Sequence, residues 1–172
     1  MDDRRRKPLL DVRGRPPEIA AIAPGLFVGE YPRAQDVGRL RTDWAVSAVL
    51  SLQDDDDLAA KGIDPKELVE AYRRGGITLR HLPVADNDPA ALAEALPVIL
   101  DALDALFREG HTVLVHCNAG FNRSPTVAIA YLHRCRSMPL EAACELVKKK
   151  RPCVPFITVL ERAFGPPRAE KG

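Results

Sequence analysis

The sequence predicts an α/β fold in which a central, mostly parallel twisted sheet is flanked by helices. Two observations lead to this prediction. Short runs rich in valine, isoleucine and leucine are typical of buried strands, and longer stretches with apolar residues three and four positions apart separate them. Alternating strands and helices favour parallel pairing and a layered architecture. With 172 residues, 46% of them hydrophobic, the chain suits a single core.

Three strands are predicted in the first half of the chain. They cover Leu26 to Val28 between two glycines, Ala45 to Leu52, and Ile77 to Leu82. Asp64-Pro65-Lys66-Glu67 has the form of a capping box with proline at the first helical position. Gly75-Gly76 suits the end of that helix. A helix is therefore expected between the second and third strands.

Four consecutive carboxylates, Asp54 to Asp57, follow the second predicted strand. A metal site is conceivable there, but no ligand pattern surrounds the four residues, and a solvated loop is the preferred interpretation. We therefore predict neither a metal site nor a cofactor.

The second half of the chain begins with a predicted long amphipathic helix. Its apolar positions are Leu92, Leu96, Ile99, Leu103 and Phe107. This helix is expected to run to Gly110 despite Pro97, and Thr112 to Val115 predicts a buried strand after it. Leu140 to Val147 predicts a further helix, whose C-terminus is a better explanation of Lys148 to Arg151 than a phosphate-rich ligand.

The most informative segment is His116-Cys117-Asn118-Ala119-Gly120-Phe121-Asn122-Arg123-Ser124, directly after that last strand. Ser124 suits a helix N-cap and Pro125 the first helical position, which predicts a strand, a tight loop and a helix. A loop at a helix N-terminus collects N–H groups and partial positive charge, so it suits a phosphate and favours a thiolate. We therefore expect Cys117 to be a nucleophile and Arg123 to hold phosphate oxygens bidentately.

This segment resembles the Cys-x5-Arg loop of the cysteine-dependent protein tyrosine phosphatases and, through Ala119-Gly120 and Ser124, their dual-specificity branch. The resemblance implies a dual-specificity phosphatase-like fold in which Cys117 attacks phosphorus, Arg123 holds the phosphoryl oxygens and Ser124 helps the thiolate to leave. The implied phosphate-binding loop, supported by His116, consists of Asn118, Ala119, Gly120, Phe121, Asn122 and Arg123. The alternative is a buried structural cysteine beside a chance arginine.

The implied mechanism needs a proton donor, because expelling an alkoxide without one is slow. Dual-specificity enzymes carry an aspartate on a loop about thirty residues before the cysteine. Leu82-Pro83-Val84-Ala85-Asp86 resembles this loop and makes Asp86 the candidate acid. The alternative is an ordinary loop carboxylate. Asp88 precedes Pro89 and a helical pattern, so it is expected to be an N-cap.

Within the dual-specificity branch, the chain most resembles the glucan phosphatases of the plant starch and laforin type, over Pro24 to Pro155. The resemblance rests on Gly62-Ile63-Asp64, Asp88-Pro89, Asn118-Ala119-Gly120 and Lys150-Arg151-Pro152-Cys153. The chain departs from that family at Asn122, where those enzymes have glycine. Sugars commonly stack on aromatic side chains, for which the candidates are Phe121, Tyr31 and Trp44.

Other activities remain open at this point. A phosphotyrosine, phosphoserine or phosphothreonine protein phosphatase is the main alternative. Phe121-Asn122-Arg123 resembles RNA 5′-triphosphatases, but these differ at Ala119, Ser124 and Pro125, and the net charge of +1 gives no sign of nucleic-acid binding. The uncharged loop argues against a phosphoinositide phosphatase. An inactive phospho-ligand-binding relative would usually have lost the cysteine, arginine or acid.

We expect a basic Pro/Arg-rich extension over residues 1–20 and a single catalytic domain over residues 21–172. Arg4, Arg5 and Arg6 suit a solvated tail better than a partner site. The sequence shows neither a secretory signal nor a membrane span, so we expect a cytoplasmic protein whose partner is a phosphorylated glucan or phosphoprotein. Cys135 and Cys144 are expected in the core on helices, with a disulfide to Cys117 as the alternative.

Overall fold

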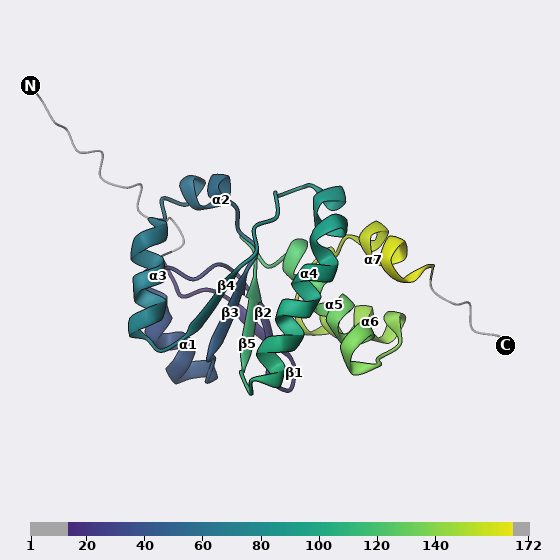
Figure 1. Ribbon diagram of the computed structural model, residues 1–172, viewed down its shortest axis with the longest axis horizontal. Coiled ribbons are helices and arrows are strands. Elements are labelled where there is room, and N and C mark those ends of the chain that lie inside the picture. The colour runs from purple at the N-terminus through teal and green to yellow at the C-terminus, as the bar shows by residue number, and fades with distance from the viewer. Residues whose placement is uncertain (1–13, 167–172) are drawn as a thin grey trace, which may run out of the picture.

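Five strands form the centre of the computed structural model, which describes residues 14–166 (Figure 1). The strands are β1 (Ile19–Ala23), β2 (Leu26–Gly29), β3 (Ala48–Ser51), β4 (Thr78–His81) and β5 (Val113–His116). Their order is β1-β2-β5-β3-β4, and β2, β5, β3 and β4 pair in parallel. The predicted α/β class is therefore confirmed. Arg4, Arg5 and Arg6 lie outside the described residues.

Strand β1 is an addition to the predicted sheet. It pairs antiparallel with β2 and lies at the edge, so most of its side chains are only partly buried or exposed. Its sequence, Ile-Ala-Ala-Ile-Ala, is apolar, but three of its five residues are alanine, which is depleted in strands. An alanine-rich run beside a proline-rich segment explains why this strand escaped prediction.

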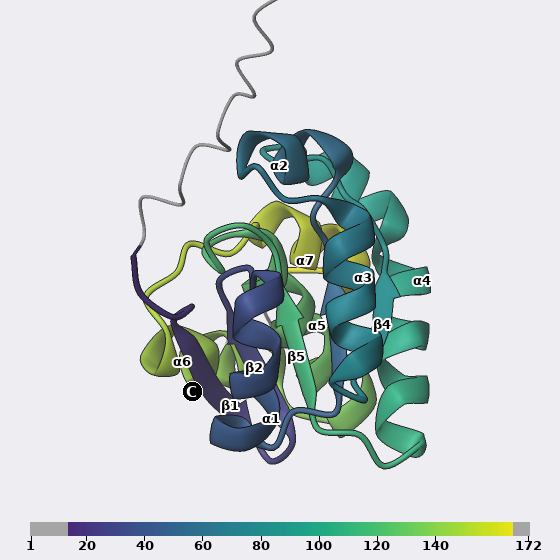
Figure 2. The same ribbon diagram turned by 90° about the vertical axis from the view of Figure 1, so that its left-hand side faces the viewer.

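One short 3₁₀ helix and seven α-helices connect and cover the strands. They are η1 (Ala34–Asp36), α1 (Val37–Trp44), α2 (Asp55–Ala60), α3 (Pro65–Arg74), α4 (Pro89–Arg108), α5 (Arg123–Arg136), α6 (Leu140–Lys150) and α7 (Ile157–Phe164). Figure 2 looks onto α1 and α3, which lie on one side of the sheet. On the other side, α4 and α5 pack together with α6 and α7 outside them (Figure 1).

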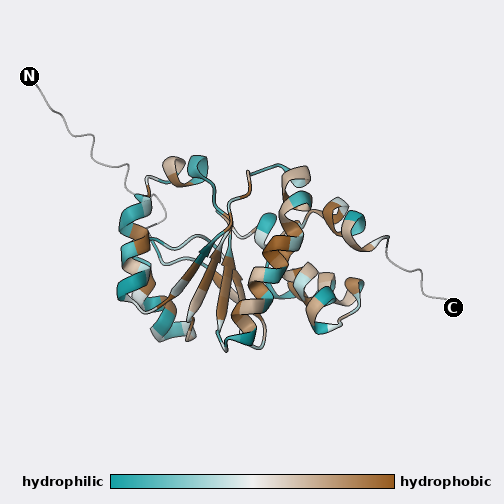
Figure 3. Cartoon of the chain, in the orientation of Figure 1, coloured by the Kyte–Doolittle hydropathy of each residue, from teal (hydrophilic) through white to brown (hydrophobic). Residues whose placement is uncertain are grey.

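Side chains on both faces of the central strands β3 and β5 are buried, because helices cover both faces of the sheet. Along β5, Leu114 belongs to the apolar cluster beneath α1 and α3, whereas Val113 and Val115 belong to the larger cluster beneath α4 and α5. The alternation follows from the pleat, which directs successive side chains to opposite faces. Figure 3 shows the same layering, with apolar residues along the strands and hydrophilic residues towards the outside.

Helices α3, α4 and α6 confirm the predicted helices. Asp64 caps α3 by accepting a hydrogen bond from the Lys66 N–H, and Asp88 caps α4 by accepting one from the Ala91 N–H. Pro97 cannot donate the backbone hydrogen bond of its position, but α4 continues through it, and the proline lies on the exposed side of the helix. Helices α1 and α7, eight residues each, had no predicted counterpart. None of the helices in residues 14–166 has the length and apolar character needed to cross a membrane.

The expected solvated loop at Asp54 to Asp57 is wrong, because these residues begin α2. Asp54 accepts a hydrogen bond from the Asp57 N–H (2.8 Å), and the Asp57 carboxylate accepts one from the Asp54 N–H (3.0 Å). This reciprocal capping satisfies two N–H groups that a helix start otherwise leaves free. Asp57 is consequently buried, with 6% of its surface exposed.

His116 ends β5 in a fully buried position. Its Nδ1 lies 2.9 Å from the carbonyl oxygen of Cys117, and since a carbonyl only accepts, Nδ1 carries the hydrogen. Burial lowers the pKa of His116 from 6.5 to about 4, although the bond to the Cys117 carbonyl acts in the opposite direction. His116 is therefore neutral at neutral pH.

We expect the free energy of unfolding to fall by about 3 kcal/mol as the pH drops from 6.5 to about 4, because only the unfolded chain then protonates His116. His116→Asn retains a hydrogen-bond donor but does not titrate, so this loss should largely disappear. Urea unfolding at several pH values measures the effect. His133→Asn, at a half-buried histidine whose Nδ1 lies 2.8 Å from the Met138 carbonyl oxygen, is the matched control for the loss of an imidazole. An unchanged slope in His116→Asn would contradict this assignment.

Candidate active site

The segment from Cys117 to Asn122 forms a loop whose carbonyl groups are bonded from outside. Four successive carbonyls accept in this way: the bonds are Tyr31 N to Asn118 O (3.0 Å), Arg151 Nη2 to Ala119 O (2.7 Å), Arg151 Nε to Gly120 O (2.7 Å) and Val154 N to Phe121 O (2.9 Å). A trans peptide directs its C=O and the following N–H in opposite directions. The N–H groups of residues 119–122 therefore turn towards the inside of the loop, where they can bind an anion.

Gly120 meets two requirements of this loop. Its φ of +64° lies in the left-handed region, which residues other than glycine rarely adopt. A Cβ at this position would also lie 2.6 Å from the Gly29 carbonyl oxygen and 2.8 Å from Arg151 Nε. The loop can approach β2 and Arg151 this closely only because the side chain is absent.

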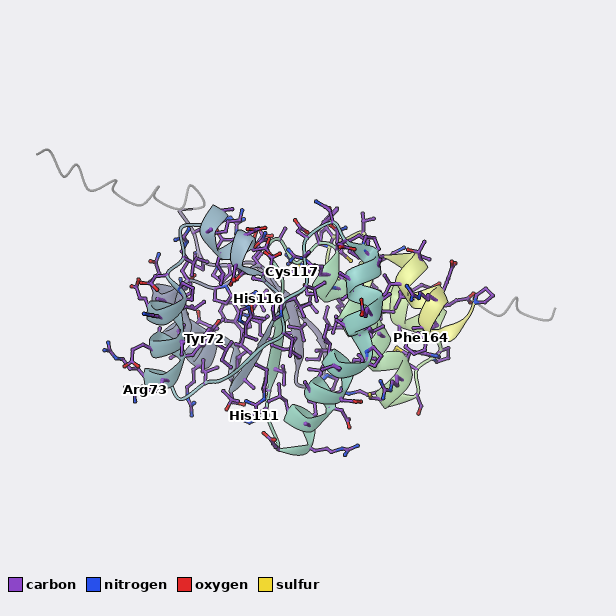
Figure 4. All side chains as sticks on the ribbon, turned by 45° about the horizontal axis from the view of Figure 1, so that its top comes forward. Tyr72, Arg73, His111, His116, Cys117 and Phe164 are labelled. Carbon is purple, nitrogen blue, oxygen red and sulfur yellow. The ribbon has the colours of Figure 1, made fainter. Side chains whose placement is uncertain are left out.

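Cys117 lies at the start of the loop, and Figure 4 places it beside His116 near the centre of the molecule. Only 3% of its surface is exposed, and its Sγ lies 3.3 Å from Ser124 Oγ. The expected N-cap role of Ser124 is wrong, because α5 already begins at Arg123 with Asn122 as N-cap. Ser124 and Pro125 therefore lie inside the first turn. The shift of the helix start leaves the Ser124 hydroxyl next to the thiol.

The Arg123 side chain is 1% exposed. One part of its guanidinium binds protein acceptors, and the other part faces the loop. Nη1 donates to Asp57 Oδ2 (2.6 Å) and to the Val84 carbonyl oxygen (2.8 Å), so protein acceptors occupy it. Nε has no hydrogen-bond partner among the described residues, and Nη2 lies 3.3 Å from Asp86 Oδ1 and 3.4 Å from Asp57 Oδ1. The Nε and Nη2 edge is the fork that suits two oxygens of a phosphate.

Asp57 is a site residue that the sequence reasoning missed. Besides Arg123, it accepts a hydrogen bond from Asn118 Nδ2 (2.6 Å), and Asn118 Oδ1 accepts one from Gln53 Nε2 (2.8 Å). Burial alone would raise the pKa of Asp57, but hydrogen bonds from Arg123, Asn118 and the Asp54 N–H, together with the Arg123 charge, lower it. The spacing of Asp54 and Asp57 could have indicated a capped helix. No local pattern indicates that Asp57 faces Arg123.

The two carboxylates of the predicted acid loop have different surroundings. Asp86 is 45% exposed, contacts Arg123 Nη2, and accepts a hydrogen bond from the Asn87 N–H (3.0 Å). Asp88 is occupied as the N-cap of α4. Asp86 is therefore the carboxylate that reaches the loop and is still partly open to solvent.

Arg151 is a second residue whose position the sequence did not indicate. Lys148, Lys149 and Lys150 are exposed at the end of α6, as expected of a helix C-terminus. Arg151 instead turns inward, is 7% exposed, and donates to loop carbonyls. Arg151 is the C-cap of α6, as the prediction of a helix C-terminus implies, but its side chain has a role that the three lysines do not share.

Of the three aromatic candidates for sugar stacking, Phe121 is the exposed one, with 44% of its surface accessible. Tyr31 is 6% exposed, and the charged groups of Arg33 and Lys61 lie 5.8 and 5.5 Å from its ring centre. Trp44 packs against the cluster beneath α1 and α3. Only Phe121 therefore presents an open ring beside the loop.

All four cysteines are free thiols. Cys135 on α5 and Cys144 on α6 pack against the main apolar cluster, as predicted, and burial raises the pKa of both thiols. Cys135 and Cys144 therefore make no disulfide to Cys117 in this structure. Residues 14–166 contain no group of three or more histidine, cysteine, aspartate or glutamate side chains suited to a metal ion.

Comparison with known proteins links this geometry to a family. The model of the dual specificity phosphatase catalytic domain matches residues 26–158. Mouse laforin is 28% identical over 77% of this chain, which spans 44% of laforin. A Castanea sativa amyloplastic phosphoglucan phosphatase, DSP4, is 32% identical over 83% of the chain and 38% of that protein. The chain thus spans less than half the length of these curated relatives.

Solved structures agree with the sequence comparison. Tk-PTP in its active form has a TM-score of 0.70 and 28% identity, with 84% of this chain and 94% of that chain covered. A mouse putative dual specificity phosphatase has a TM-score of 0.66 and 29% identity, with 87% and 86% covered. On the strength of the family match over residues 26–158, the chain belongs to the dual specificity phosphatase family.

Proposed function

We propose that this protein is a cysteine-dependent phosphatase that hydrolyses phosphomonoesters through a phosphocysteine intermediate. The observation that carries the proposal is the convergence of three groups on the loop. These are the Cys117 thiol beside Ser124, the unoccupied Nε of the buried Arg123, and the inward N–H groups of residues 119–122. Together they supply a nucleophile and the donors for a phosphoryl group. The proposed mechanism requires no metal or cofactor.

In the first step, the Cys117 thiolate attacks phosphorus and forms the S–P bond as the bond to the leaving oxygen breaks. The equatorial oxygens are held by the loop N–H groups and by the Nε and Nη2 edge of Arg123. Asp86 donates its proton to the leaving oxygen. A bound phosphate would compete with Asp86 for Arg123 Nη2, and the released carboxylate, which is open to solvent, would take up from water the proton that it then donates.

In the second step, water attacks the phosphocysteine, and Asp86 takes a proton from that water. The S–P bond breaks, and the thiolate leaves with help from the Ser124 hydroxyl, 3.3 Å away in the resting site. Inorganic phosphate is the product. Each group then returns to its starting protonation state, so the cycle is balanced.

We propose phosphorylated glucan as the substrate class. The phosphoglucan phosphatases and laforin align with 77–83% of this chain, whereas the dual specificity protein phosphatases 5 and 1 align with 42–45% of it. Phe121 offers one exposed aromatic face beside the loop for a sugar ring. Phosphoprotein is the alternative substrate, favoured by those shorter matches at 36–38% identity.

The four free thiols suit a reducing compartment, in keeping with a cytoplasmic location for the protein.

Cys117→Ser should abolish turnover of an aryl phosphate while preserving phosphate binding, because only the nucleophile changes. The assay is steady-state hydrolysis alongside calorimetric titration with inorganic phosphate. Cys135→Ser, at a site away from the loop, should remain active. Full activity of Cys117→Ser, or inhibition of the wild type by a chelator, would rule out the mechanism. An inactive wild type that binds phosphate would favour the phospho-ligand-binding relative.

Asp86→Asn should slow alkyl phosphates at least about 10-fold more than activated aryl phosphates, because poor leaving groups need the proton more. In Asp86→Asn, the descending limb of the pH–rate profile should also disappear, because that limb reflects loss of the proton from the general acid. Asp88→Asn is the matched control and should retain the wild-type preference. If Asp88→Asn shows the selective loss instead, the acid is Asp88. If neither variant does, a phosphoanhydride leaving group and the RNA 5′-triphosphatase alternative gain support.

Phosphorylated amylopectin and glycogen should be turned over with a higher kcat/KM than phosphotyrosyl or phosphothreonyl peptides. Phosphate release at equal phosphoester concentration measures this preference. Phe121→Ala should then reduce glucan turnover several-fold and leave a small aryl phosphate nearly unaffected, since only the glucan reaches the ring. Faster turnover of the peptides would instead assign the protein to the phosphoprotein phosphatases.

A further inference from the structure

Residues 151–156, between α6 and α7, form a segment that we call the strap. It meets the phosphate-binding loop and the first turn of α5 at five points. Arg151 donates to Ala119 O and Gly120 O, the Val154 N–H donates to Phe121 O, Asn122 Nδ2 donates to Val154 O (2.6 Å), and the Phe156 N–H donates to Thr126 Oγ1 (2.8 Å). The strap thus follows the loop along its outer side.

Arg151 makes the most extensive of these contacts. Nε and Nη2 each lie 2.7 Å from a loop carbonyl, and Nη1 lies 3.3 Å from the carbonyl oxygen of Glu18, just before β1. The guanidinium is planar and its N–H donors point in fixed directions within that plane, so they define where the three carbonyl oxygens lie. A lysine ammonium has a single nitrogen and cannot reproduce this arrangement.

The hydrogen bonds from Arg151 to the two loop carbonyls also determine the direction of the N–H group in each of the same two peptide units. Because the carbonyls of Ala119 and Gly120 face Arg151, the N–H groups of Gly120 and Phe121 face the inside of the loop. Gly120 has a positive φ and no side chain, so its own preferences hold the loop weakly. The orientation of these peptides is therefore held by Arg151, which lies 28 residues beyond Arg123 in the sequence.

We propose that Arg151 is a positioning residue that aims the Gly120 and Phe121 N–H groups at the phosphoryl oxygens and at the Cys117 thiolate. This inference rests on the proposed phosphatase function. Arg151 itself does not touch the substrate; it acts from the outer side of the loop. Removing Arg151 should therefore weaken the stabilisation of both the phosphoryl group and the Cys117 thiolate. If Arg151 only joined the strap to β1, its removal would affect folding alone.

The test compares Arg151→Met and Arg151→Lys in the full chain, with Arg162→Met on the exposed side of α7 as the control for loss of a positive charge. Three quantities are measured: kcat/KM for an aryl phosphate, the inhibition constant of inorganic phosphate, and the pH midpoint of Cys117 alkylation by iodoacetamide. Mass spectrometry of the Cys117 peptide separates it from the other three cysteines. Thermal unfolding identifies variants that lose the fold.

In Arg151→Met, we expect kcat/KM to fall about 10- to 100-fold, less than the roughly 10²- to 10³-fold cost of removing an oxyanion donor outright, because the N–H groups remain and only their direction is lost. The phosphate inhibition constant should rise, and the alkylation midpoint should move to higher pH. Arg151→Lys should recover part of each effect, and Arg162→Met should match the wild type. Arg123, Asp57, Asp86 and His116 are unchanged in every variant, and Arg151→Lys keeps the positive charge beside the loop, so a midpoint raised in Arg151→Lys reports the loop N–H groups.

A folded Arg151→Met protein with the wild-type midpoint and inhibition constant would overturn the proposal. If Arg151→Met does not fold, Arg151→Lys decides: a wild-type midpoint there overturns the proposal, and a raised one supports it. If the wild type fails to hydrolyse the aryl phosphate, the proposed function is wrong. In that case, calorimetric titration with phosphate and the pH midpoint of Cys117 alkylation still test the role of Arg151. Failure of the proposed function and failure of the Arg151 proposal are therefore distinguishable.

Discussion

The ion pair between Arg123 and Asp57 is the interaction on which the rest of the site depends. Both side chains are almost fully buried, and the Nη1 to Oδ2 distance is 2.6 Å. Removing two charges from water is costly, and a buried pair often contributes little net stability. The geometry offers a different benefit. With Nη1 bound to Asp57 and to the Val84 carbonyl, the guanidinium cannot rotate, and its Nε and Nη2 edge stays directed towards the loop.

That arrangement links three segments that are distant in sequence. Asp57 comes from the helix after β3, Val84 from the acid loop after β4, and Arg123 from the helix after β5. Parallel strands bring these three connections to the same edge of the sheet, where α/β proteins commonly bind their ligands. The pairing of β3 with both β4 and β5 therefore makes the Arg123 contacts possible.

The sequence predicted what depends on local pattern. Cys117, the glycine in the loop, and the apolar periods of β5 and α4 each follow from neighbouring residues, so their elements were expected correctly. What depends on tertiary contact was missed: Asp57 resembled its three neighbouring aspartates, and Arg151 resembled the three lysines before it. In both cases, similar side chains stand in a row, and only the packing separates the buried residue from the solvated ones. Strand β1 was missed because its apolar run is rich in alanine, which is depleted in strands.

The loop also shows how an anion site can arise from the hydrogen-bonding needs of buried backbone. The carbonyl groups of this tight loop need donors where the strap and β2 cover them, and an unpaired buried carbonyl is costly. Tyr31, Arg151 and Val154 supply those donors from outside. Each bond they make leaves the next N–H on the inner side, where no backbone carbonyl of residues 14–166 accepts it. In the proposed mechanism, an incoming oxyanion completes the set of hydrogen bonds, so the contacts that satisfy the loop from outside also prepare it for phosphate inside.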